Sequence, residues 1–200
     1  MEITQIIQEA LNNSMPYSQY RALMESHVLN KTNTGNEITE ALANYTMLNN
    51  QRMKRLDKKL ELQPETLDFL SNYHGKVRFL VITESWCGDA AQTMPMIHKI
   101  AEAGGIDLRI VLRDENEALM NEFLTNGNKA IAKLIIIDPE TNKPLNSWGP
   151  RPTGATQLVQ KEKKEKGTLS PEFKQELQGW YNKDKGRGTE KDLIKLLEDI

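Results

Sequence analysis

The spacing of apolar residues predicts helices over the first third of the chain. Apolar positions recur every three to five residues between 38 and 60, close to one helical face, while the charges of "RMKRLDKK" belong to its solvated side. The segment "NKTNTGN" before it is typical of a loop, and Pro16 can open an earlier helix at its first turn. Pro64 starts another short helix, which Gly75 ends. We therefore expect residues 3–63 to be helical throughout, apart from that loop.

Three short apolar runs in the centre of the chain predict buried strands. They are "VRFLVIT" (77–83), "IDLRIVL" (106–112) and "KLIIID" (133–138), all rich in β-branched residues. Between them we expect a helix from about 88 to 103, closed by two glycines, and a second helix over "DENEALMNEFL" (114–124). Strands separated by helices predict parallel pairing through right-handed crossovers.

A closing hairpin makes the predicted sheet mixed. The turn "PETNKP" is followed by "LNSW" (145–148), a short strand that can pair antiparallel with the strand before it. After Pro152 the chain becomes helical and polar again, and "QKEKKEK" is an exposed helix end whose charges balance. "NKDKGRG" (182–188) predicts a flexible connection, and residues 189–200 predict a final amphipathic helix. The fold class is therefore α/β, with a central mixed sheet flanked by helices.

This order of elements divides the chain into three segments. They are an N-terminal helical extension (1–75), a central α/β core (76–152) and a C-terminal helical extension (153–200). Two hundred residues can bury a good core, and one domain with helical additions is more economical than two. We therefore expect both extensions to pack on the core as one compact domain.

The composition excludes several classes of function. The formal net charge of −2 gives no reason to expect a nucleic-acid or membrane partner. No apolar stretch approaches the roughly 20 residues needed to span a bilayer, and the N-terminus has neither the basic nor the apolar region of a signal peptide. The single cysteine rules out an intramolecular disulfide and fits a reducing compartment, so we expect a cytoplasmic protein.

That cysteine, Cys87, lies between a predicted strand and a predicted helix. This order presents the sulfur at a helix N-terminus, where unpaired backbone N–H groups and the macrodipole favour an anion and can lower a thiol pKa. Asp89 opposes the effect, since a carboxylate two residues away penalises a second negative charge. We expect a mildly activated thiol at best, and the alternative is a small buried cysteine that only packs.

Other polar residues near the predicted strand ends have structural explanations. His98 lies eleven positions after Cys87, roughly 16 Å along a helix, and is therefore a packing or surface residue and not a base for the thiol. Arg113 could offer a cation at the carboxyl end of a strand, although pairing with nearby acids is the favoured explanation. Helix N-terminal charge explains the carboxylates of "DENE". No spacing of His, Cys, Asp and Glu suggests a zinc site, and no cofactor is expected.

The residues around the cysteine resemble the active site of thioredoxins. "WCGDA" (Trp86–Ala90) is similar to the Trp-Cys-Gly-x-Cys motif of that family, and Pro95 falls where the family's active-site helix carries a kinking proline. "IAK" (Ile131–Lys133) sits where thioredoxins have Ile-Pro-Thr with a cis proline. More narrowly, "TESWCGD", "LRDEN" and "WGPRP" resemble a group of bacterial thioredoxin-like proteins of unassigned function. The wider match covers residues 77–149, and the narrower one reaches back to about residue 52.

The resemblance implies a thioredoxin-like fold, and two departures from the family pattern limit its chemistry. Ala90 replaces the resolving cysteine, so release of a mixed disulfide from Cys87 would need an external thiol. Ala132 replaces the cis proline, and because a cis bond before a non-proline residue costs about 2.5–4 kcal/mol, we expect a trans peptide or a reshaped loop. The resemblance also implies a set of substrate-contacting residues, namely Trp86, Gly88, Asp89, Ile131 and Ala132.

Three functions are compatible with these residues. The first is single-cysteine thiol–disulfide exchange, in which Cys87 attacks a protein or small-molecule disulfide and a second molecule resolves the product. The second is a binding module that has kept the fold and lost the catalysis, with the terminal helices as its partner surface. The third, a minor one, is an iron–sulfur cluster shared between two chains through their Cys87 thiolates. The position of Cys87 narrowly favours the first function, while its missing partners favour the second.

Overall fold

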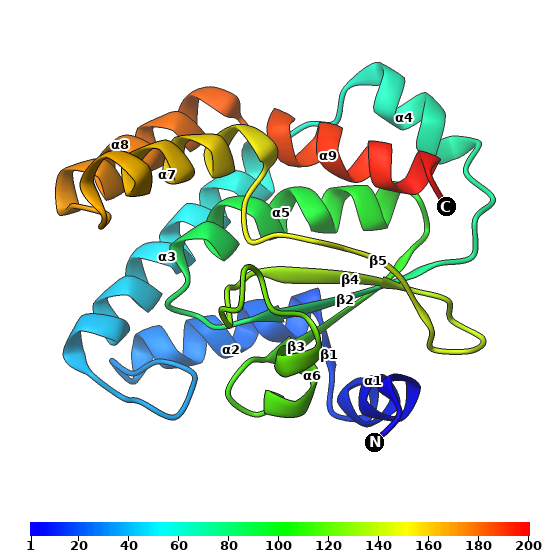
Figure 1. Cartoon of the computed structure of the whole chain (residues 1–200), viewed down its shortest axis with the longest axis horizontal. Helices are drawn as coiled ribbons and strands as arrows, with labels where there is room; N and C mark the ends of the chain where they lie inside the picture. Colours follow the sequence, from blue (N-terminus) through cyan, green and yellow to red (C-terminus); the bar gives the residue numbers. More distant parts are fainter.

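A five-stranded mixed sheet lies at the centre of the computed structural model, which describes residues 1–200 (Figure 1). Its strand order is β1-β3-β2-β4-β5, and none of the surrounding helices has both the length and the apolar character needed to cross a membrane. The strands are β1 (Met15–Pro16), β2 (Arg78–Thr83), β3 (Asp107–Leu112), β4 (Lys133–Ile137) and β5 (Pro144–Trp148). The helices are α1 (Ile3–Asn12), α2 (Tyr17–Leu29), α3 (Glu40–Lys59), α4 (Pro64–Ser71), α5 (Gly88–Ala103), α6 (Glu117–Glu122), α7 (Thr153–Lys166), α8 (Pro171–Asp184) and α9 (Arg187–Glu198).

Strand β2 lies between β3 and β4 in the middle of the sheet. It pairs parallel with β3, where Val81 faces Ile110, and antiparallel with β4, where Val81 faces Leu134. The predicted parallel pairing is therefore wrong for β4. The connection from β3 to β4 contains only the six-residue helix α6, about 9 Å long, which is too short to carry the chain back along the length of a strand to the end of the sheet where β3 begins. Strand β5 pairs antiparallel with β4, which confirms the predicted hairpin.

Helices cover both faces of the sheet. α5 and α9 lie on one side, whereas α1 and α6 lie on the other (Figure 1). All five residues of β4 are buried, and β2 is buried from Phe79 to Thr83. Because side chains on both faces of these strands are covered, the strands are almost continuously apolar in sequence, which is the pattern that predicted them.

The N-terminal segment contains an element that the helical pattern does not predict. Strand β1 interrupts the helices between α1 and α2 and pairs antiparallel with the edge of β3. The Arg109 guanidinium of β3 holds this edge by donating to the Ser14 carbonyl over 2.8 Å. A strand of two residues has no hydrophobic period, so sequence spacing cannot detect it. Helix α4 also ends sooner than predicted, at Ser71 instead of near Gly75.

The C-terminal helices are connected more tightly than predicted. Only Lys185 and Gly186 separate α8 from α9, so the flexible connection expected over 182–188 is wrong. Both residues adopt left-handed backbone conformations, with φ values of 54° and 80°. A Cβ atom at Gly186 would lie 2.7 Å from the Met96 side chain, so glycine lets α9 begin directly against α5. Lys, Asp and Gly are as common in tight turns as in linkers, and composition cannot distinguish the two.

Two hydrophobic cores of different size stabilise the structure. The main core includes residues of all three segments, among them Met24, Leu80, Ile97 and Leu193. Helices α7 and α8 form a hairpin with a separate small core, made of Ala155, Val159, Phe173, Leu177 and Tyr181. This hairpin lies beside α3 and the N-terminal end of α5 (Figure 1), where the Gln92 side-chain amide donates to Gln178 Oε1 over 2.9 Å. The C-terminal extension therefore reaches the predicted site.

Candidate functional site

Cys87 forms the N-cap of α5, as the order of strand, loop and helix predicts. Strand β2 ends at Thr83, and the turn that follows is closed by the Cys87 amide, which donates to the Glu84 carbonyl over 3.1 Å. The Ala90 amide points back at the sulfur and lies 3.4 Å from Sγ. The sulfur therefore faces the first turn of the helix, where a thiolate would be favoured.

The thiol is nevertheless covered, and it acts as a hydrogen-bond donor. Cys87 is only 8% exposed, and its Sγ donates to the Ile131 carbonyl over 3.2 Å. Burial, with a smaller contribution from the Asp89 carboxylate, raises the pKa of Cys87 to about 12, although the Ala90 amide opposes the rise. The expected mild activation of the thiol is therefore wrong. Loss of solvation outweighs the helix N-terminus, because the amides of Ala90 and Asp89 and the Arg151 charge lower the pKa by less than burial raises it.

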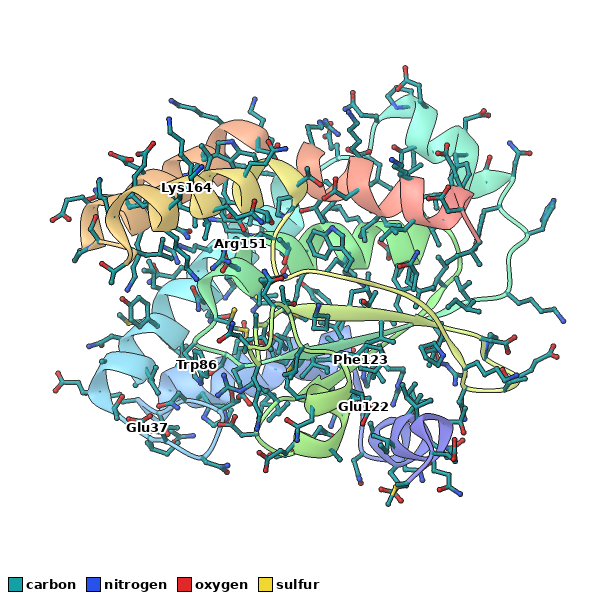
Figure 2. The ribbon with its side chains drawn as sticks, in the orientation of Figure 1. Glu37, Trp86, Glu122, Phe123, Arg151 and Lys164 are labelled. Carbon is teal, nitrogen blue, oxygen red and sulfur yellow. The ribbon has the colours of Figure 1, made fainter.

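Asp89 forms an ion pair and a further hydrogen bond beside the motif. Its carboxylate accepts from the Arg151 guanidinium over 2.6 Å and from the Tyr181 hydroxyl over 2.9 Å. Burial raises the pKa of Asp89, while the Arg151 charge and the Tyr181 hydroxyl oppose that rise. Arg151 follows the closing hairpin, and Figure 2 shows it where the chain passes from β5 to α7. The "WGPRP" segment therefore supplies a counter-charge to the first turn of α5.

The Ile131–Ala132 peptide lies next to the sulfur and is cis. The prediction of a trans peptide is wrong, because it used the preference of an isolated peptide, whereas this segment is enclosed on both sides. Cys87 contacts the Ile131 carbonyl, and Gly149 packs against the Ala132 carbonyl. A Cβ atom at Gly149 would lie 2.2 Å from that oxygen, and its φ of +115° also requires glycine.

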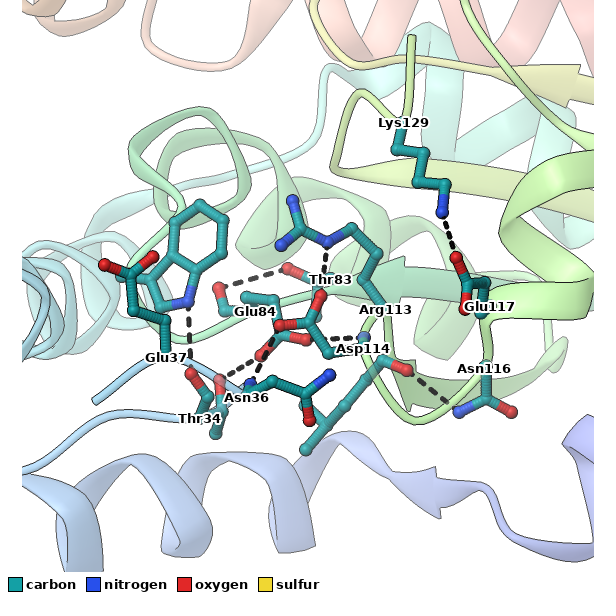
Figure 3. A network of polar contacts seen from close by, with 12 residues as sticks. Thr34, Asn36, Glu37, Thr83, Glu84, Arg113, Asp114, Asn116, Glu117 and Lys129 are labelled. Atoms are coloured by element: carbon teal, nitrogen blue, oxygen red, sulfur yellow. Dashed lines mark hydrogen bonds and ion pairs between the residues drawn. The ribbon is translucent and has the colours of Figure 1, made fainter.

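A buried carboxylate, Glu84, organises the other side of the motif (Figure 3). It is completely buried and accepts hydrogen bonds from the Thr34 hydroxyl and from the Asp114 amide, the latter over 3.0 Å. Burial raises the pKa of Glu84. The prediction does not include Glu84 among the site residues, because no spacing in the sequence connects it with the loop at Thr34.

The loop between α2 and α3 closes over the motif from outside the sheet. Thr34 and Ser85 exchange two hydrogen bonds, from the Thr34 amide to Ser85 Oγ (3.0 Å) and from the Ser85 amide to Thr34 Oγ1 (2.8 Å). The Trp86 indole donates to the Thr34 carbonyl over 3.1 Å. These three hydrogen bonds join the turn to the loop, so a loop predicted only as a connection holds the motif in place.

The remaining polar candidates have packing roles. Arg113 pairs with Asp114 over 2.7 Å and lies 4.9 Å from the centre of the Trp86 ring, so the prediction that it pairs with an acid is confirmed. Asp114 accepts from the Asn36 amide and does not cap a helix, because α6 begins only at Glu117. The explanation by helix charge is therefore wrong for Asp114. His98 stacks on the Tyr17 ring at 4.1 Å, which confirms a packing role.

The structure divides the predicted site residues between two regions. Cys87, Ile131 and Ala132 are buried together on what we call the thiol side. Trp86, Gly88 and Asp89 face away from it and line a hollow of about 470 Å³ between α3 and α8. The other residues that line this hollow are Leu42, Tyr45, Arg52, Arg151, Leu169, Lys174, Gln175, Leu177 and Gln178.

A second hollow extends the first along α3. It has a volume of about 330 Å³ and shares Arg52 and Gln178 with the first. Its other residues are Leu48, Gln51, Arg55, Gln92 and Asn182. We call the two hollows together the α3–α8 groove. None of the predicted site residues except Trp86, Gly88 and Asp89 reaches it, and the sequence contains no motif that indicates it. In the whole chain, no three His, Cys, Asp or Glu side chains are arranged to hold a metal ion.

Comparisons with known proteins connect this geometry to one family. A family model described as thioredoxin matches residues 35–164. A crystal structure of PA1234, a protein of unknown function from Pseudomonas aeruginosa, is 19% identical, with a TM-score of 0.60 over 76% of this chain and 85% of that one. An HIV epitope scaffold of the 4E10 type is 15% identical, with a TM-score of 0.60 over 93% of this chain and 99% of the other. No curated protein matches. At these identities, the two structures support the fold alone.

Proposed function

This chain belongs to the thioredoxin family, and from that premise we propose that it is a binding protein in which Cys87 does not act as a nucleophile. The proposal rests on one observation. The thiol of Cys87 is covered and donates its proton toward the Ile131 carbonyl, in surroundings that raise its pKa to about 12. A neutral, packed thiol at the redox position of the family supports the second of the three functions predicted above.

The pKa decides how much reactive thiol is present. The thiolate is the nucleophile in disulfide exchange, and burial raises the pKa of Cys87 to about 12, so the thiol is almost entirely neutral at pH 7. An ordinary thiol with a pKa of about 8.5 would be ionised to a few per cent. The chain also holds no second cysteine, so a mixed disulfide could not be resolved from within. Both facts argue against turnover on protein disulfides.

The binding surface that we propose is built by the helices outside the predicted core. Most residues that line the α3–α8 groove come from an N-terminal helix and a C-terminal helix, and the predicted core contributes Trp86, Gly88, Asp89, Gln92 and Arg151. The family's motif therefore positions the groove without supplying its chemistry. A partner bound there would contact the motif on the face opposite to the sulfur.

Single-cysteine exchange is the second candidate, and the Ala90 amide at 3.4 Å from Sγ supports it. In that reaction a Cys87 thiolate would attack one sulfur of a disulfide, form a mixed disulfide and release the other sulfur as a thiolate that takes up a proton. An external thiolate would then attack the substrate sulfur bonded to Cys87 Sγ. This attack forms a new disulfide with the substrate and releases Cys87 in the reduced state. The minor alternative, a cluster shared between two chains, would need two such sulfurs exposed toward each other.

The rate of Cys87 alkylation by iodoacetamide tests the proposal. We expect the rate of the native protein to keep rising up to about pH 10, without a plateau, because the thiolate fraction increases throughout that range. The same protein in denaturant provides the control and should show a midpoint near 8.5. A native midpoint well below that value, together with turnover of a small disulfide in the presence of an external thiol, would establish the exchange reaction instead.

A further inference from the structure

We propose that the α3–α8 groove binds an acidic, partly apolar peptide segment of a partner protein. This inference rests on the proposed binding role and names the chemistry of the partner. It depends on the shape, the apolar content and the charge of the groove, all of which are properties of side chains outside the thiol side.

The groove is elongated and suits a chain-like ligand. Its two hollows are joined at Arg52 and Gln178. Along α3 it extends from Leu42 to Arg55, which corresponds to about 20 Å of helix. About six residues of an extended peptide cover this length. A compact small molecule would fill one hollow and leave the other empty.

Apolar side chains of α3 line the end of the groove nearest Leu42. Leu42, Tyr45 and Leu48 follow each other on one face of α3, and Tyr45 and Leu48 are 49% and 39% exposed. Leu169 and Leu177 lie across the groove from them. Large apolar residues clustered in a hollow are typical of an interaction site, whereas single exposed ones are ordinary. The partner should therefore present leucine-like or aromatic side chains.

The charge of the groove is opposite in sign to the net charge of the protein. The chain carries a formal charge of −2, yet the lining residues include four cations and one acid. The acid, Asp89, is already paired with Arg151. The three other cations, Arg52, Arg55 and Lys174, make no ion pair anywhere in the chain.

The arginines of α3 are held near each other without an anion between them. Arg52 donates only to the Asn49 side chain, and Arg55 donates to Asn182 across the groove. Burial and the neighbouring Arg55 charge lower the pKa of Arg52. A carboxylate placed between the two guanidinium groups would relieve this repulsion and could bind in bidentate fashion. Acidic side chains are therefore the polar part of the partner that this groove fits.

Fluorescein-labelled peptides of about eight residues provide the probes, with affinity measured by fluorescence anisotropy. One alternates glutamate with leucine and phenylalanine, a second has lysine in place of glutamate, and a third has serine in place of the apolar residues. We expect the first to bind at least about tenfold more tightly than either of the others, with an affinity that falls as salt increases. Equal binding of the lysine peptide, or no binding of any peptide, would overturn the inference.

Matched variants locate the site. The double variant R52Q/R55Q should weaken binding of the glutamate peptide by about tenfold or more, and Y45A by a similar factor. K58Q on the exposed side of the same helix removes a charge outside the groove and should leave the affinity unchanged. If the free protein is a dimer and Y45A dissociates it, a second copy of the chain occupies the groove, and the inference is overturned. The C87S variant separates the two proposals. If C87S binds the glutamate peptide normally while the native thiol proves reactive, the proposed function is refuted and the peptide-binding role of the groove is retained.

Discussion

Two regions meet at the first turn of α5 and differ in how their polar groups are satisfied. On the thiol side, the Cys87 hydrogen and the Ile131 carbonyl are paired with each other, and in the adjoining turn the Glu84 carboxylate has partners on both oxygens. In the α3–α8 groove, by contrast, Arg52 and Arg55 have only amide partners and Tyr45 is half exposed. The polar groups of the first region are all paired within the protein, whereas the second region has cations without an ion-pair partner and exposed apolar surface.

This difference shows that motif residues and binding chemistry can be separated within one fold. Polar groups that are buried in a protein are normally paired, because an unpaired buried donor or charge destabilises the fold and lowers the free energy of unfolding. The thiol side meets this requirement internally and is therefore a stabilising element. Unpaired cations at the surface are tolerated because water solvates them, and a ligand can replace that water. Substitutions in the two regions should consequently have very different effects on stability.

The largest effect is expected from Asp89→Ala, which removes the central acid between Arg151 and Tyr181. Loss of the carboxylate leaves the Arg151 charge unpaired in a largely buried position, where its Nε already lacks a partner. We expect the free energy of unfolding, measured by urea denaturation, to fall by about 3 kcal/mol or more. Because the Asp89 carboxylate also raises the pKa of Cys87, the variant should alkylate faster at a given pH below 10.

A surface ion pair provides the control for Asp89→Ala. Glu117 pairs with Lys129 in an exposed position, and Glu117→Ala should cost less than about 1 kcal/mol. If Asp89→Ala were as mild as this control, the ion pair between Asp89 and Arg151 would not be a stabilising element.

The next effect is expected from Gly149→Ala, which tests the close packing behind the thiol. The new Cβ would lie 2.2 Å from the Ala132 carbonyl oxygen, and the backbone would have to keep a φ of +115°. We expect a loss of about 2–3 kcal/mol in urea denaturation, together with a more exposed Cys87 thiol that alkylates faster. Gly167→Ala is the matched control, since Gly167 also has a positive φ but no atom within 4 Å of the added Cβ. Equal losses in the two variants would show that backbone strain alone, and not contact with Ala132, explains the effect.

Sequence reasoning succeeded where the signal is local. The bounds of α5 at Gly88 and Ala103 are those predicted, because a cysteine N-cap and two glycines mark its ends. The strands β2 to β5 differ from the prediction by a residue or so at their ends, since short β-branched runs mark β2 to β4 and a turn sequence precedes β5. The direction of β4 and the presence of β1 depend on the length of connections and on edge pairing, which hydrophobic spacing does not record.

The candidate site was predicted only in part, for the same reason. The place of Cys87 at a helix N-terminus follows from neighbouring residues, and it is confirmed. Its coverage depends on the Ile131 carbonyl, which lies 44 positions further along the chain, and the groove depends on α8, which is further still. No single-sequence pattern connects such positions, so neither the high pKa of the thiol nor the groove could be foreseen.

A smaller effect is expected from Thr34→Val, which preserves the shape of the loop residue and removes its hydroxyl. The Ser85 amide would lose its acceptor, and the Glu84 carboxylate would lose a donor in a fully buried position. We expect a loss of about 2 kcal/mol in the free energy of unfolding. Thr168→Val at an exposed position should change stability by less than about 0.5 kcal/mol. A neutral Thr34→Val would mean that water replaces the hydroxyl, and that the loop does not hold the motif.

The smallest effect is expected from Leu48→Ser in the α3–α8 groove, and it sharpens the comparison most directly. Leu48 is exposed and contributes no buried contact to either core, so its replacement should change the free energy of unfolding by less than about 0.5 kcal/mol. Leu56→Ala on the same helix is the matched control, because Leu56 belongs to the main core and should cost about 2–5 kcal/mol. If Leu48→Ser leaves stability unchanged and weakens the glutamate peptide, leucine at this position serves binding alone. A loss of stability comparable with that of Leu56→Ala would instead show that the groove is closed in solution, and that both regions beside α5 are packed.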